Sequence, residues 1–174
     1  MKKILLSVAV IAFAIGCKCN KTDAAKNTVK VDLEPKSGST VSGTATFSEH
    51  NGRVTLDVKL SGLKPGVHAI HIHEKADCSS ADGSSAGGHW NPTFKKHGKW
   101  GEGDYHKGDI GNVTADPSGN AKLSMTTEEW CIGCGDETKD ILGKGLIVHE
   151  KADDFTTQPT GNAGGRQACA GIIK

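Results

Sequence analysis

Five of the chain's eight histidines fall between positions 71 and 106, and this clustering constrains the fold more than any other feature. They are His71, His73, His89, His97 and His106, and the stretch closes on Asp109. Most of it reads as loop, and a loop of this length is uncommon in a compact domain unless it is functional or disordered. Imidazole and carboxylate groups are ligands of zinc and copper, so we predict that bound metal orders this loop. A surface loop that carries histidines by chance accounts for one or two of them, not five.

Short segments with alternating apolar and polar residues flank the loop, as expected for half-buried strands. Apolar runs with helical period are scarce, 23 residues are glycine, and Asn51-Gly52 is a strong hairpin signal. Candidate strands cover residues 28–34, 39–47, 53–60, 67–73, 110–115, 121–125, 146–149 and 167–173, and 110–115 and 121–125 are expected to pair as a hairpin. Eight such strands predict an all-β antiparallel sandwich or flattened barrel.

The overall charge gives no reason to expect a nucleic-acid partner. The chain of 174 residues, enough for one domain, carries 21 basic and 20 acidic residues, a formal net charge of +1, and has no basic run. Any attraction for an anion must therefore be local, set by metal ions and a few placed cations.

The N-terminus is typical of an export signal. Lys2 and Lys3 precede an apolar run over residues 4–15 that is too short to span a membrane. Ala14-Ile-Gly-Cys17 resembles a bacterial lipobox, whereas Ala12-Phe-Ala14 has the form of an ordinary export cleavage site. We favour the lipoprotein route, because Gly-Cys directly follows the apolar run. We therefore predict a signal peptide over 1–16, a tether over 17–27 and a domain over 28–174, located in the periplasm or on an extracytoplasmic membrane surface and lipid-anchored at Cys17.

The predicted strand over 67–73 determines which way its three histidines point. Side chains alternate across a strand, so His71 and His73 point to one face as a pair of ligands, and His68 points away as a structural histidine. His149 lies on a later apolar strand, where a core role and a third ligand position both fit. His50 is expected to be exposed beside the Asn51-Gly52 turn.

The remaining donors favour two different metals. His97, His106 and Asp109 lie within thirteen residues, and with one more nitrogen they make a closed tetrahedral set that favours zinc. An all-imidazole set of His71, His73 and His149 favours copper. His89 fits either set, and a deprotonated imidazole can ligate two metals at once.

Several ordered segments resemble the Cu/Zn superoxide dismutase family over about residues 29–174. They are Gly66-Val-His-Ala-Ile-His-Ile-His-Glu74, Gly87-Gly-His-Trp-Asn-Pro92, Lys96-His-Gly98, His106-Lys-Gly-Asp-Ile-Gly-Asn-Val-Thr-Ala-Asp116, Val148-His-Glu-Lys-Ala-Asp-Asp154 and Gly161-Asn-Ala-Gly-Gly-Arg-Gln-Ala-Cys169. The resemblance implies an eight-stranded Greek-key barrel with long metal-binding and electrostatic loops. It implies copper at His71, His73, His89 and His149, and zinc at His89, His97, His106 and Asp109, with His89 bridging.

The same resemblance implies the other site residues and the reaction. Cys78 and Cys169 match the family's disulfide, Arg166 its arginine beside copper, and Asp153 a carboxylate that links ligand histidines of the two metals. The expected activity converts superoxide into dioxygen and hydrogen peroxide, with Arg166 and His89 as catalytic residues, for antioxidant defence in the cell envelope. We expect a monomer or a homodimer that contacts the membrane only through the lipid anchor.

Three features depart from the family pattern or fall outside it. Cys131-Ile-Gly-Cys134 can be a local disulfide, a redox pair or an accessory metal site, and an extracytoplasmic setting favours the disulfide. Cys19 stays open between a free, paired and modified thiol. Gln158 and Pro159 stand where more charge is expected, so we predict a weaker dependence of rate on ionic strength than a Lys/Glu-rich loop gives.

Two alternatives to the enzyme are a non-catalytic member of the fold that buffers copper or zinc, and a surface module whose metals only hold the loop. The presence of all four copper positions and Arg166 argues against the first. Metal content and superoxide consumption, measured on one sample, separate all three.

Overall fold

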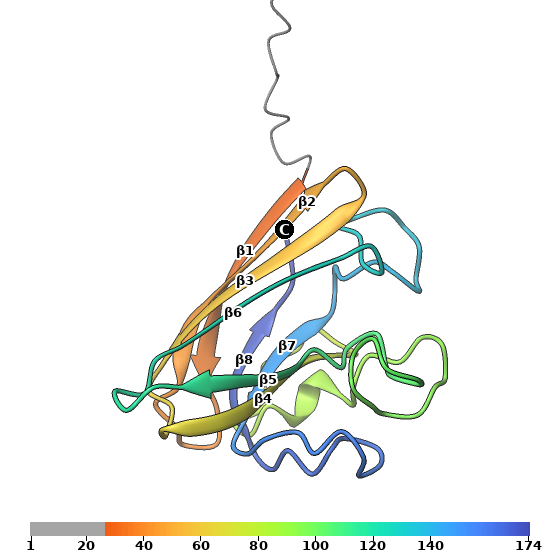
Figure 1. Ribbon diagram of the computed structural model, residues 1–174. Helices are drawn as coiled ribbons and strands as arrows, with labels where there is room; N and C mark the ends of the chain where they lie inside the picture. Colours follow the sequence, from red (N-terminus) through yellow and green to blue (C-terminus); the bar gives the residue numbers. More distant parts are fainter. Residues whose placement is uncertain (1–26) are drawn as a thin grey trace, which may run out of the picture.

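Eight antiparallel strands form the body of the molecule, in the order β5-β4-β7-β8-β1-β2-β3-β6 (Figure 1). They are β1 (Asn27–Pro35), β2 (Ser42–His50), β3 (Arg53–Ser61), β4 (Gly66–His73), β5 (Gly111–Ala115), β6 (Ala121–Thr127), β7 (Gly145–His149) and β8 (Arg166–Gly171), with one 3-10 turn, η1 (Ser84–Ala86). This computed structural model describes residues 27–174. The predicted signal peptide, Cys17, Cys19 and the tether up to residue 26 lie outside the described residues. Over 27–174, no helix has the length and apolar character needed to cross a membrane.

The strands form two layers that join along one edge. Strands β1, β2, β3 and β6 make one layer, and β5, β4, β7 and β8 make the other. A short ladder joins β1 to β8 at Glu34↔Cys169 and Pro35↔Ala168. At the opposite edge, β5 and β6 approach each other without forming a ladder, so the barrel is nearly closed. The predicted all-β class and flattened barrel are confirmed.

The connection between β6 and β7 makes the topology a Greek key. Strands β4, β5 and β6 follow one another around the barrel, and β7 returns over residues 128–144 to pair with β4. The same return brings His149, at the end of β7, beside the two histidines of β4.

The prediction that residues 110–115 and 121–125 pair as a hairpin is wrong. The turn exists, because Asp116 N donates to Asn120 O at 2.8 Å, but the strands on either side diverge. Val113 pairs with His68 of β4, and Leu123 pairs with Val58 of β3. A turn signal predicts that the chain reverses, but it does not predict which ladder each strand joins.

The second predicted strand, 39–47, is displaced toward the C-terminus. Residues 36–39 form a turn in which Ser39 N donates to Lys36 O at 3.0 Å, and β2 begins at Ser42. At its other end β2 extends to His50, which pairs with Arg53 across the Asn51-Gly52 turn. As predicted, His50 is exposed.

Alternate residues of the strands fill the space between the layers. Apolar side chains of β1, β2 and β3 meet Ile70 and Ile72 of β4 in one continuous core. Trp130, from the β6–β7 connection, is 1% exposed and packs edge-on against Phe47 at 6.4 Å between ring centroids. This core makes β4 a rigid support, and its other face carries His71 and His73.

Candidate metal centre

Two histidines of β4 form the base of the site. His71 and His73 are 0% and 1% exposed and project from the face opposite Ile70 and Ile72. His68 lies on the Ile70 face, where its Nδ1 is 2.9 Å from His149 O and its Nε2 is 2.8 Å from Lys64 O. Both nitrogens of His68 therefore bond to backbone, and its predicted structural role is confirmed.

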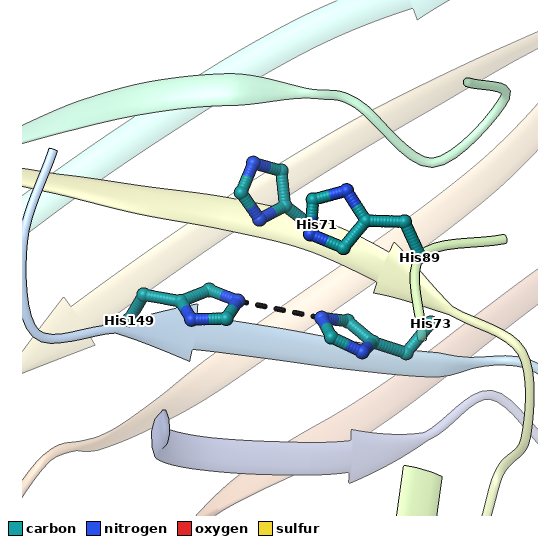
Figure 2. Close-up of side chains that lie close together, drawn as sticks. All are labelled: His71, His73, His89 and His149. Atoms are coloured by element: carbon teal, nitrogen blue, oxygen red, sulfur yellow. Dashed lines mark hydrogen bonds between the residues drawn. The ribbon is translucent and has the colours of Figure 1, made fainter. Parts of the chain in front are cut away.

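A four-histidine cluster gathers around these two residues, and Figure 2 shows its rings. Ligand atoms of His71, His73, His89 and His149 all lie within 4.8 Å of one another. His73 Nε2 and His149 Nε2 face each other at 3.3 Å, the dashed line in Figure 2. His89 reaches the cluster from the long loop through an isolated bridge with His73, and its ring centroid is 4.0 Å from that of His71.

The second cluster, called here the Asp109 cluster, lies within the long loop. It contains His89, His97, His106 and Asp109, with ligand atoms again within 4.8 Å of one another. Asp109 lies 2.8 Å from His89 Nδ1, 3.0 Å from His97 Nδ1 and 3.2 Å from His106 Nδ1. Its carboxylate is fixed by the backbone N–H groups of His106 and Gly98, which donate to Oδ2 at 2.8 and 3.1 Å.

Unsatisfied nitrogens show that the two clusters fit metal ions. Buried polar atoms are nearly always hydrogen-bonded, yet four buried imidazole nitrogens make no hydrogen bond, and the two nearest Asp109 face only its carboxylate, another potential ligand. Two, His71 Nδ1 and His89 Nε2, belong to the four-histidine cluster, and two, the Nδ1 atoms of His97 and His106, belong to the Asp109 cluster. Lone pairs that converge in a buried space, without donors to meet them, are what a bound cation requires.

In His73 and His106, the ring nitrogen that faces away from the cluster contacts a backbone carbonyl oxygen. His73 Nδ1 is 2.9 Å from Gly87 O, and His106 Nε2 is 3.1 Å from Lys95 O. Bonds of this kind fix the tautomer and direct the other nitrogen of each ring toward the cluster. His89 differs from the rest, because its Nδ1 faces Asp109 and its Nε2 faces the four-histidine cluster.

Asp153 connects the two clusters. Its Oδ2 is 2.8 Å from His71 Nε2, and its Oδ1 is 2.9 Å from His97 Nε2. The backbone N–H of Phe155 also donates to Oδ1, at 2.7 Å. One carboxylate thus orients a ring in each cluster, at the position where a linking carboxylate was expected.

The electrostatic environments of the clusters differ. Burial, followed by the charge of neighbouring rings, holds the pKa of His73 and that of His149 well below the usual value. Burial also lowers the pKa of His89, to about 4, although its bond to Asp109 opposes this. Burial lowers the pKa of His97 too, but Asp109 and Asp153 outweigh it and raise that pKa to about 9. The lowered pKa values favour the neutral, metal-ligating form of His73, His89 and His149.

Arg166 begins β8 beside the four-histidine cluster. Its two terminal nitrogens donate to Gly83 O at 2.6 Å and Gly87 O at 2.7 Å. Because Gly87 O also bonds His73 Nδ1, one carbonyl sets the position of both a cationic fork and a cluster ring. Burial lowers the pKa of Arg166, but the guanidinium remains charged, and it is near enough to affect the titration of His73 and His149.

Both predicted disulfides are present. Cys78 and Cys169 are joined with a Cα–Cα separation of 5.8 Å, which ties the long loop to β8 three residues from Arg166. Cys131 and Cys134 form a local disulfide, which the sequence analysis favoured over a redox pair or an accessory metal site. Asp140 lies close to these two sulfur atoms and accepts hydrogen bonds from Gly133 N and Gly135 N.

Sequence reasoning missed two residues that shape the Asp109 cluster. The side-chain amide of Gln158 forms two bonds with the backbone of His97, one in each direction, both at 2.9 Å. Gly161 has φ +66°, and a Cβ there would lie 1.8 Å from Asp153 Oδ1 and 2.6 Å from His97 Nε2. The glycine-rich segment 161–165 was a sequence signal for the second, whereas nothing local predicts the contact of Gln158.

Comparison with known proteins agrees with this geometry. The family model described as copper/zinc superoxide dismutase matches residues 41–172. The chain is 34% identical over 180 residues to a Cu-Zn superoxide dismutase of Deinococcus radiodurans, with 97% of this chain and 96% of that protein covered. It also resembles the crystal structure of the clock protein EA4, at 35% identity and a TM-score of 0.70, with 84% of this chain and 97% of that one covered. The chain belongs to the copper/zinc superoxide dismutase family.

Proposed function

We propose that this superoxide dismutase holds copper in the four-histidine cluster and zinc in the Asp109 cluster, with His89 shared between them. The family uses copper and zinc, and the activity is superoxide dismutation. The assignment of each metal follows donor chemistry, since an all-imidazole set suits copper and a set of three imidazoles and one carboxylate suits zinc. The single observation that carries the proposal is His89, whose two nitrogens face different clusters.

Bound copper supplies the one-electron exchange by which two superoxide anions and two protons become dioxygen and hydrogen peroxide. Arg166 binds the anion, because its guanidinium is a fixed cation held beside the cluster by Gly83 O and Gly87 O. Both of these partners are backbone oxygens. Among the described residues, no carboxylate forms an ion pair with Arg166, so its positive charge is available to the anion.

His89 holds and releases a proton at Nε2. That nitrogen is buried and has no hydrogen-bond partner, while Asp109 fixes the ring through Nδ1. Burial lowers the pKa of the metal-free ring to about 4, so the ring is neutral at neutral pH and its unpartnered Nε2 is available to accept a proton. Asp153 orients His71 and His97, and Asp109 orients His89, so the rings around this nitrogen keep their relative positions.

One purified sample tests the function and the metal assignment together. We expect one copper and one zinc per chain by elemental analysis, together with rapid superoxide consumption. Zinc at full occupancy without copper and without turnover would instead support a metal buffer or a structural module. Replacement of His89 by Ala should separate the metal centres spectroscopically, because no imidazole would then connect them.

We also propose that the mature chain begins at Cys17 and is lipid-anchored outside the cytoplasm. The Gly16-Cys17 pair that ends the apolar run supports this. Two disulfides in the described residues also support it, since disulfides persist in oxidising compartments. Incorporation of a labelled fatty acid into the wild type, and not into Cys17→Ser, tests the anchor. A soluble mature chain that begins at Ile15 would contradict it and point to cleavage after Ala12-Phe-Ala14.

A further inference from the structure

The loop 128–144, which includes the Cys131–Cys134 disulfide, is not used by the proposed chemistry. It lies on the same side of the barrel as the metal-binding loop, to the right in Figure 1. Trp130, at its start, is 1% exposed and stacks edge-on against Trp100 of the metal-binding loop, with ring centroids 5.3 Å apart. The loop therefore makes direct contact with the segment that carries the Asp109 cluster.

Polar contacts from this loop hold both neighbours of His106. Tyr105 Oη donates to Glu129 Oε1 at 2.5 Å, and Lys107 Nζ forms an ion pair with the other oxygen of the same carboxylate. Trp130 Nε1 donates to the backbone carbonyl of Lys107 at 2.9 Å. Three interactions thus fix the residues immediately before and after His106, none of them with a ligand atom.

The loop is itself closed by a second set of contacts. Cys131 N donates to Lys139 O at 2.9 Å, Ile141 N donates to Cys131 O at 3.2 Å, and the disulfide joins Cys131 to Cys134. The Asp140 carboxylate accepts from Gly133 N, Gly135 N and Leu142 N. These contacts fix the backbone at Cys131, directly after Glu129 and Trp130, so the two residues are presented from a rigid support.

We propose that the loop 128–144 is a brace for zinc, with Glu129 and Trp130 as positioning residues that raise zinc affinity without touching the metal. The inference rests on the proposed assignment of zinc to the Asp109 cluster. His106 comes from irregular backbone, so part of the free energy of metal binding goes into ordering its segment. A segment already held at both neighbours of His106 loses less freedom when the metal binds.

Glu129→Gln is the main test, with Glu128→Gln as its matched control. Glu128 is the preceding residue and loses the same charge, but its ion pair is with the exposed Arg53 at 3.8 Å, away from the metal-binding loop. We expect Glu129→Gln to weaken zinc binding about tenfold, at the low end for residues that support ligands from outside. Glu128→Gln should bind zinc as the wild type does. Tyr105→Phe, which removes a single hydrogen bond, should give a smaller loss in the same direction.

Zinc affinity is measured by competition with a chelator, and the visible spectrum of Co²⁺ in the same site reports ligand geometry. A lower thermal stability of metal-free Glu129→Gln with unchanged zinc affinity would overturn the proposal and leave a merely structural contact. Equal losses in Glu128→Gln and Glu129→Gln would overturn it in favour of a general charge effect. Asp109→Ala serves as the reference, because retention of zinc by that variant would contradict the zinc assignment itself rather than the brace.

The disulfide gives a second test of the same brace. Cys131→Ser/Cys134→Ser opens the loop without affecting Cys78–Cys169, which a chemical reductant would also attack. We expect zinc affinity to fall in the double variant, and copper affinity to remain as in the wild type. A double variant with wild-type zinc affinity would restrict the brace to Glu129 and Trp130, and it would overturn any role for the disulfide.

Discussion

The two metal clusters share one histidine but are held by different parts of the fold. His71 and His73 stand on β4, and His149 ends β7, which pairs with β4, so ladder hydrogen bonds place three of the four histidines. His97, His106 and Asp109 all lie in loop between β4 and β5. Geometry in the first cluster therefore comes from the sheet, whereas geometry in the second depends on contacts from other loops.

The two clusters also differ in the number of carboxylates around them. Within 27–174, no carboxylate contacts the inward nitrogens of the four-histidine cluster, and Asp153 reaches only the outer side of His71. The Asp109 cluster contains one carboxylate and contacts a second through His97. Burial lowers the pKa values of His73, His89 and His149, whereas the two acidic neighbours of His97 outweigh burial and raise its pKa.

Removal of a sheet-borne ligand should have the largest effect. His71→Ala deletes one copper ligand, and we expect loss of copper and of superoxide consumption with zinc still bound. Metal analysis and an activity assay of the same sample check this. Full activity in His71→Ala would contradict the assignment of copper to the four-histidine cluster.

Removal of the carboxylate ligand should act on the other cluster. Asp109→Ala removes a charged metal ligand. It also removes the hydrogen-bond acceptor of the backbone N–H groups of His106 and Gly98. Zinc affinity should fall by at least about 100-fold, more than for residues that only support ligands. Chelator competition measures the loss, and Asp104→Ala, an exposed carboxylate of the same loop paired with Lys95, is the control.

Asp153→Asn tests the connection between the clusters. An amide keeps the shape but cannot accept from both His71 and His97, so each ring loses part of its orientation. We expect affinity for both metals to fall by about 10- to 100-fold. A loss for zinc alone would show that the sheet holds His71 without help, which would sharpen the contrast between the two clusters.

Gln158→Ala tests how far the loop-built cluster depends on a distant residue. Two hydrogen bonds to the backbone of His97 disappear, and the free energy of unfolding should fall by about 1–2 kcal/mol. Chemical denaturation measures this, and zinc should dissociate faster with no change in copper binding. Gln158→Glu keeps an acceptor for His97 N and loses the donor, so its effect should be smaller.

The smallest effect is expected at Asp140, in the loop 128–144 that contacts the segment carrying the Asp109 cluster. Burial would raise the pKa of this carboxyl, but backbone N–H donors, chiefly Gly135 and Gly133, outweigh it and lower the pKa from 3.8. A lowered pKa stabilises the folded state above the unfolded-state value, and this contribution is lost as pH falls through the folded-state value. Metal-free wild type should therefore exceed Asp140→Asn in stability at neutral pH, with a smaller gap in acid. A gap independent of pH would contradict a role for the charge.

The sequence by itself determined the strand pattern and the chemistry of the donors. Alternation predicted eight strands and the shared face of His71 and His73, because side-chain direction along a strand is a local property. Imidazole and carboxylate spacing predicted two metals, and the ordered motifs pointed to the family and to the Cys78–Cys169 disulfide.

Only the tertiary structure decided which strands pair and what holds the loops. The separation of β5 from β6, the two bonds of Gln158 to His97, and the contacts of Glu129 with Tyr105 and Lys107 join residues far apart along the chain. No local preference predicts such pairs, since their partners meet only when the barrel closes and brings its connections to one side. The sequence specifies which residues can act as metal ligands, and the contacts formed when the barrel closes determine how firmly each ligand is held.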